Sequence, residues 1–420
     1  MLDNKEAGKL IQNSWLRFNS NIGALYAMFE NIPSFADQID KAKIKEIANE
    51  LAFIFKDKPE IVEKDISKYI PSVDDLDVYP DFRKNPSVKE IVLAFQDQEI
   101  KDAMLEWGAK KPYRSERLRR LFSSVFNNPP MNGVLIRRSM LVSLVTFLEI
   151  LLEDIYKSHH LILGETKEGT QKATDKLMRG GWQKRLENLH VIGLGTPIIS
   201  KYIGEVVEIA QRRNLLVHND GVVDDDYEAR ISNKYQVGDH LLVSTKYFQQ
   251  AIDIFHVVGF VLSYSQLEQY EENRQALYNK LDEFVLDSLD QRRYSIVLVL
   301  SENFENLNLP ENKQLIILAN RAIAFRELGM VEEVEKIVFF LMNAEHDWQI
   351  DMAISMLKND ISALKRHIKD APNVSNIARI STWPLFDPVR NELWFKAAFA
   401  KKSKVQLSKK TRKNDRIISI

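Results

Sequence analysis

The sequence PIISKYIGEVVEIAQRRNLLVH, residues Pro197–His218, indicates the fold class of the region around it. Apolar residues recur at every third or fourth position, which is the spacing of one face of an α-helix. Thr196 can cap this helix, Pro197 suits its first position, and Gly221 is placed to end it. The face consists of Ile199, Ile203, Val206, Ala210, Arg213 and Val217.

The same helical spacing continues on both sides of this stretch. It predicts helices over Leu135–Tyr156, Lys176–Leu189 and His240–Ser265. Between them we expect a polar connector, Gly164–Thr174, and a short hairpin, Ala229–Gly238. The sequence therefore predicts an all-α fold.

Breaks in the pattern divide the chain into four parts. Residues 1–130 form an N-terminal helical region that closes at Asn-Asn-Pro-Pro, residues 127–130, a strong helix breaker. Residues 131–270 form the middle domain, 271–400 form paired helices, and 401–420 form a basic tail. The tail is typical of a solvated chain end or of a contact with RNA.

The paired helices have a loose internal period. Similar segments begin at Leu289, Leu328 and Leu357, in steps of 39 and 29 residues. Asn320–Gly329 resembles the first helix of a tetratricopeptide repeat, whose period is about 34 residues, and Trp383–Phe395 is similar to the segment that closes such arrays. The resemblance implies a protein or peptide partner. Generic helix pairs remain the alternative.

Composition narrows the classes of protein. The 420 residues include no cysteine, which removes disulfides and thiolate chemistry and fits a reducing cytoplasm. The first ten residues lack the pattern of a signal peptide, and no apolar stretch reaches the length of about 20 residues that a bilayer requires. We therefore expect a cytoplasmic protein without a membrane segment.

The net charge of −1 means that any attraction to nucleic acid must come from local basic clusters. One such cluster spans residues 110–120 and includes Arg117 and Arg120. This basic cluster either contacts RNA or forms an ordinary solvated helix face. A divalent ion at Asp224–Asp226 is not expected, because no metal-binding motif surrounds this acidic run.

Two opposite charges interrupt apolar stripes. Arg213 lies on the stripe of Pro197–His218, and Glu149 lies on the stripe of Leu135–Tyr156. A buried charge is costly unless it is paired, so the two side chains either bind each other or line a site between helices or subunits. An ion pair without chemistry is one possible outcome.

His218 follows Arg213 by five residues, so their side chains diverge by about 140 degrees on an ideal helix. Asn214 and His218, four residues apart, share a face. Either the long arginine reaches around the helix, or a two-fold dimer brings two copies of this helix together and unites the groups. The geometry favours the second, so we expect a homodimer.

Arg213-Asn-Leu-Leu-Val-His218 fits the R-x4-6-H motif of HEPN ribonucleases. Arg138–Glu149 is similar to the first core helix of that superfamily, and the resemblance covers about 132–265. The bare motif occurs three times, because Arg212 also fits with His218 and Arg185 fits with His190. Only Arg213 combines a polar successor, a stripe position and the Asn-Asp-Gly continuation.

The resemblance implies a HEPN-like helical bundle and a metal-independent endoribonuclease that needs no cofactor and yields a 2′,3′-cyclic phosphate. His218 would act as base or acid and Arg213 would bind the phosphate, while Asn214 and Glu149 would orient these groups. The resemblance also implies that the enzyme is a toxin or antiphage effector, as HEPN ribonucleases commonly are. The alternative is a non-catalytic interaction or regulatory protein. Additional RNA contacts are expected from Arg212, Arg117 and Arg120.

Overall fold

The computed structural model describes residues 4–54, 77–79, 98, 102, 132–194, 197–231, 235–270, 274–302, 309–371 and 381–400. About 82% of them are helical, so the chain is all-α as predicted. Two compact units are present. One contains the residues up to Gly195 together with Ile199–Gln266, and the other contains Thr196–Ile198 and the residues from Leu267 onward.

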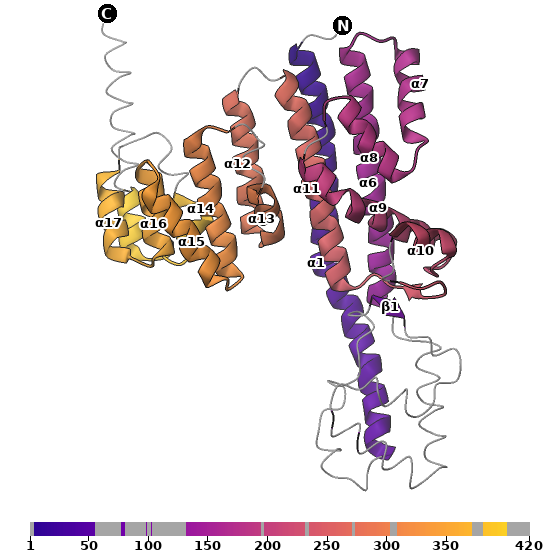
Figure 1. The fold of residues 1–420 in the computed structure, drawn as a ribbon. Coiled ribbons are helices and arrows are strands. Elements are labelled where there is room, and N and C mark those ends of the chain that lie inside the picture. The colour runs from indigo at the N-terminus through magenta and orange to yellow at the C-terminus, as the bar shows by residue number, and fades with distance from the viewer. Residues whose placement is uncertain are drawn as a thin grey trace, which may run out of the picture. The chain divides into compact units, whose positions relative to one another are not determined.

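The first unit is a bundle in which long helices run side by side (Figure 1). One two-residue antiparallel ladder accompanies them, with Val78 opposite Leu241 and Tyr79 opposite His240. The elements are α1 (Asn4–Ile54), β1 (Val78–Tyr79), α6 (Asn132–Ile162), α7 (Lys167–Met178), α8 (Trp182–Val191), α9 (Pro197–His218), α10 (Asp225–Ile231), β2 (His240–Leu241) and α11 (Thr245–Tyr270).

Helix α1 lies in the region predicted as a separate N-terminal part, yet it belongs to the same unit as α6 and α11. Trp15 of α1 packs edge-on against Phe260 of α11, with ring centroids 5.4 Å apart. The buried carboxylate of Asp40 accepts hydrogen bonds from the side chain of Asn132 at 2.8 Å and from the amide of Gly133 at 3.1 Å. Asp40 of α1 therefore caps the first turn of α6.

The contact between α1 and α11 depends on a glycine. A Cβ atom added to Gly259 would lie 2.2 Å from a ring carbon of Phe18, a core residue. We expect Gly259→Ala to lower the free energy of unfolding by about 1–3 kcal/mol through overpacking, measured by urea denaturation. Gly23→Ala is the control, because its added methyl meets open space and removes a helix glycine. Equal stability of both variants would contradict this packing.

Four local predictions were wrong. The helix predicted over Lys176–Leu189 is interrupted at residues 179–181, between α7 and α8. Residues 229–231 are the end of α10, so the predicted hairpin over Ala229–Gly238 does not form. Asp224, the first residue of the acidic run, caps α10 by accepting a hydrogen bond from the amide of Tyr227 at 2.9 Å. Most of the predicted connector is helix α7, capped by Thr166. His240 lies in β2, and α11 starts later, where Ser244 accepts from the amide of Tyr247.

The second unit consists of helix pairs followed by a short closing segment. The first helices of the three pairs begin at Arg274, Glu311 and Trp348, 37 residues apart each time. Trp383 of the closing segment donates from its ring nitrogen to the buried Asn320 at 2.7 Å. The elements are α12 (Arg274–Asp290), α13 (Tyr294–Glu302), α14 (Glu311–Glu327), α15 (Val331–Asn343), α16 (Trp348–Leu357), α17 (Ile361–Asp370) and the 3-10 helix η5 (Pro384–Phe386).

The three pairs share one type of turn. Arg292, Gly329 and Asn359 have positive φ values of 57°, 74° and 56°. In each turn the next amide donates to the carbonyl five residues before it, as in Met330 to Phe325 at 2.9 Å. This is the Schellman motif that ends many helices. The repeated segments detected in the sequence mark these turns.

Candidate active site on α6, α8 and α9

Helices α6 and α9 bring together the two charges predicted on their apolar stripes. Nη2 of Arg213 lies 3.2 Å from Oε2 of Glu149, and the two side chains are 20% and 30% exposed. Nη1 of Arg213 donates to Oδ1 of Asn214 at 3.1 Å. Three of the four predicted catalytic residues therefore form one partly buried cluster that solvent can still reach.

Arg185 of α8 is a further member of this cluster, which its position in the sequence did not indicate. Its Nη1 lies 2.6 Å from Oε1 of Glu149. Its Nε donates to the carbonyl of Gly180 at 2.7 Å, and its own carbonyl accepts from the hydroxyl of Tyr156 at 2.7 Å. One carboxylate thus binds two guanidinium groups that come from different helices.

His218 is the last residue of α9, and its side chain is exposed. Within the described part of the chain, no hydrogen bond or ion pair joins it to another residue. Since α9 is a continuous helix from Pro197 to His218, the divergence between Arg213 and His218 predicted from their spacing is present. His190, the other motif histidine, contacts Ser200 through Nε2 at 3.3 Å.

The end of α9 is fixed in position by α6 and β2. Arg138 of α6 donates to the carbonyl of Leu216 and to Oδ1 of Asp220, the latter at 2.7 Å. Gly221 has a φ of 83°, and a Cβ atom there would lie 2.7 Å from the carbonyl oxygen of Leu241. Only glycine fits this position without strain, so the turn directly after His218 has a defined shape.

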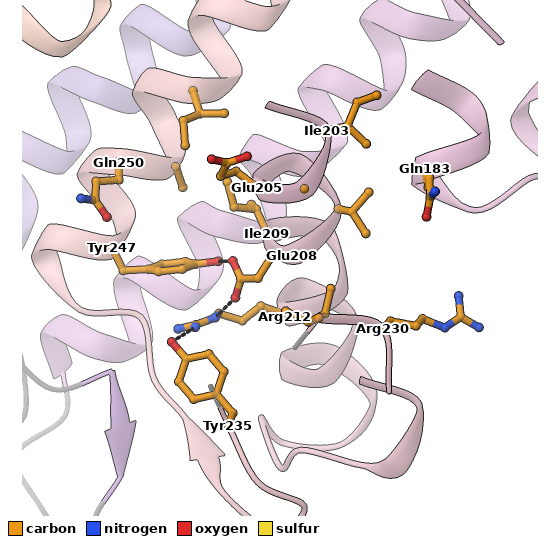
Figure 2. A pocket seen from close by; sticks show the side chains of 15 residues that line it. Gln183, Ile203, Glu205, Glu208, Ile209, Arg212, Arg230, Tyr235, Tyr247 and Gln250 are labelled. Carbon is orange, nitrogen blue, oxygen red and sulfur yellow. Dashed lines mark hydrogen bonds and ion pairs between the residues drawn. The ribbon is translucent and has the colours of Figure 1, made fainter. Parts of the chain in front are cut away.

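Arg212 was expected to contact RNA, but the structure buries its side chain. Its side chain is fully buried, and Figure 2 shows it between Tyr235 and Glu208. Nε donates to Glu208 at 2.8 Å, and Nη2 donates to the hydroxyl of Tyr235 at 2.7 Å. Nη1 donates to the carbonyl of Leu242 at 2.9 Å. A guanidinium without exposed surface cannot reach a phosphate in this conformation, so we assign Arg212 a structural role.

Glu208 is the centre of this buried network. Tyr227 and Tyr247 donate to its two oxygens at 2.7 and 2.6 Å. Burial raises the pKa of Tyr227 and Tyr247, and Glu208 reinforces the effect while Arg212 opposes it, so both hydroxyls stay protonated donors. Glu208, Arg212, Tyr235 and Tyr247 line one part of a cavity of about 560 Å³ between α8, α9, α10 and α11 (Figure 2). The sequence signal for the network was the spacing of Glu208 and Arg212, four residues apart.

The remaining predicted site residues fall into two groups. Arg117, Arg120 and the basic tail lie outside the described residues. Asp226 of the acidic run pairs with Arg230 at 2.8 Å and therefore has a helical partner. In the part of the chain that the structure describes, no group of histidine and acidic side chains is arranged to hold a metal ion.

Comparisons were made with protein-family models, curated proteins and solved structures. None of them matched the chain. A search for membrane helices, confined to the described residues, found none with the length and apolar content needed to cross a bilayer. The contacts described above define the candidate site: Glu149, Arg185, Arg213 and Asn214, with His218 at the exposed end of α9.

Proposed function

We propose that the chain is a metal-independent endoribonuclease that cleaves RNA through attack of the 2′-hydroxyl on the adjacent phosphorus. One observation carries this proposal. Arg213, bound to Glu149 and Asn214, lies on the same helix as the exposed His218. The resemblance of residues 213–218 to the HEPN motif supports the same chemistry. Purified protein should cleave single-stranded RNA, and replacement of His218 should slow the cleavage strongly.

The proposed roles follow from the chemistry of each group. His218 takes the proton of the 2′-hydroxyl or protonates the 5′-oxygen as the bond from phosphorus to that oxygen breaks. Arg213 binds the phosphate and offsets the charge that develops there. Asn214 and Glu149 orient these groups. The products are a 2′,3′-cyclic phosphate and a 5′-hydroxyl. A toxin or antiphage effector would use such cleavage to stop growth.

A homodimer is the second element of the proposal. One histidine cannot act as base and acid at the same instant, so a second His218 from another copy would supply the other role. We expect light scattering at micromolar concentration to give twice the mass of one chain. A strictly monomeric sample that still cleaves RNA would contradict the shared site.

Metal independence follows from the proposed roles, since each proton transfer and each charge is assigned to a side chain. We expect RNA cleavage to continue at an unchanged rate in the presence of excess EDTA. The measurement is a time course of cleavage of a labelled RNA with and without the chelator. Loss of cleavage on chelation that Mg²⁺ or Mn²⁺ restores would contradict the mechanism.

A second candidate function is protein or peptide binding through tetratricopeptide-like helix pairs, and the exposed apolar side chains of α15 favour it. Val331, Phe339 and Phe340 are 64%, 72% and 55% exposed, an unusual amount of apolar surface for one helix. Such exposed apolar side chains suit an interaction module. If a pure sample leaves RNA intact while Arg213 and His218 are in place, this second function replaces the first.

A further inference from the structure

Two arginines from different helices bind the two oxygens of one carboxylate. Nη1 of Arg185 contacts Oε1 of Glu149 at 2.6 Å, and Nη2 of Arg213 contacts Oε2 at 3.2 Å. Two guanidinium donors directed at two oxygens of one anion are also the arrangement that binds a phosphate. Glu149 therefore lies where the non-bridging oxygens of a phosphodiester could lie.

The charges in this cluster do not cancel. Two cations face one anion, because the next acidic residues along α6 have other partners. Glu153 pairs with Lys157, and Asp154 pairs with Arg17. One positive charge in a partly buried setting attracts an anion more strongly than an isolated surface cation does, since solvent screens it less.

The two arginines also have hydrogen-bonding capacity left over. Nε of Arg213 is buried and has no acceptor within the described part of the chain. Nη2 of Arg185 forms no hydrogen bond with the described residues. A buried donor without an acceptor costs free energy, so a ligand oxygen that supplied one would be favoured. All three side chains remain between 15% and 30% exposed, which gives an anion access.

We infer that Arg185 and Arg213 form a binding site for one phosphodiester group of RNA, and that Glu149 occupies this site in the free protein. When the phosphate binds, Arg213 exchanges Glu149 for a phosphate oxygen. Arg185 contacts a second phosphate oxygen while it keeps the carboxylate neutralised. The Nε bond from Arg185 to Gly180 and the Trp182 ring 5.5 Å from its guanidinium hold Arg185 in place. This inference rests on the proposed function, because it names the substrate contact of that site.

The test measures binding without cleavage. The full chain is titrated into a fluorescein-labelled single-stranded oligonucleotide with 2′-deoxy sugars, which cannot undergo 2′-hydroxyl attack, and anisotropy gives Kd. Glu149→Gln removes the competing charge and should tighten binding about fivefold, whereas Arg185→Met should weaken it about tenfold. Inorganic phosphate should compete with the oligonucleotide, and better in Glu149→Gln than in the wild type.

Two variants keep the test decisive. Glu153→Gln removes an acidic charge one turn away that pairs with Lys157, so it should change Kd less than twofold. Arg185→Lys keeps the charge and the fold but loses the forked geometry, so it should weaken binding even if Arg185→Met unfolds. Unchanged Kd in Glu149→Gln and Arg185→Lys, with intact circular dichroism, would overturn the inference. If Kd shifts as predicted but the chain does not cleave RNA, the phosphate-binding site is supported and the proposed nuclease activity is contradicted.

Discussion

His218→Ala is expected to reduce RNA cleavage by a factor of about 10² or more, the usual contribution of a positioned acid or base. The free energy of unfolding should fall by less than about 1 kcal/mol, because the side chain is exposed and has no partner among the described residues. Initial cleavage rates and urea denaturation measure the two effects. A large loss of activity with an unchanged fold separates catalysis from architecture.

The matched control is His190→Ala. His190 belongs to the other motif match, Arg185 to His190, and contacts Ser200 on α9. We expect its replacement to change the cleavage rate less than about twofold, since it has no role in the proposed proton transfers. If His218→Ala keeps full activity while its fold is intact, the HEPN-like interpretation of α9 is wrong, and the catalytic groups lie elsewhere in the chain.

Arg213→Met is expected to abolish cleavage but to cost only about 1 kcal/mol of stability. The sequence pattern indicated Arg213 as the one cationic partner of Glu149. In the structure Arg185 still binds that carboxylate at 2.6 Å, so the charge stays compensated. The double variant Arg185→Met with Arg213→Met should cost about 2–3 kcal/mol, more than the sum of the single changes, because Glu149 then has no cation. Urea denaturation of the four proteins in this cycle gives the coupling.

Additivity in that cycle would contradict the shared carboxylate. Adding Glu149→Gln to the double variant supplies the control, since it removes the unpaired charge. Stability should then partly return, while cleavage should stay absent because Arg213 is missing. Recovery of cleavage in this triple variant would show that the phosphate contact lies elsewhere in the chain.

The sequence predicted the all-α fold because periodic apolar faces need only local information. It also predicted the facing positions of Glu149 and Arg213, since each charge interrupts a stripe of known spacing. The stripe was less accurate at its C-terminal end. Val217 is 49% exposed, and Arg212 is fully buried because Tyr235 and Leu242 cover a second side of α9. A pattern along one helix does not reveal which neighbours cover its other sides.

One feature of the site and one of the fold depended on tertiary structure. Arg185 reaches Glu149 from α8, and no spacing in the sequence connects residues 36 apart on two different helices. Helix α1 joins α11 because Gly259 leaves room for the Phe18 ring, a contact between residues far apart in the chain. Local periodicity alone would have assigned α1 to a separate domain.

The most direct test of the proposed function is mass spectrometry of the RNA ends produced by the purified chain, with His218→Ala in parallel. Cleavage by 2′-hydroxyl attack predicts 2′,3′-cyclic phosphate and 5′-hydroxyl ends in the wild-type digest, and about 10²-fold fewer of these ends from the variant after the same time. Ends with a 5′-phosphate and a 3′-hydroxyl, or equal amounts of product from His218→Ala, would contradict it.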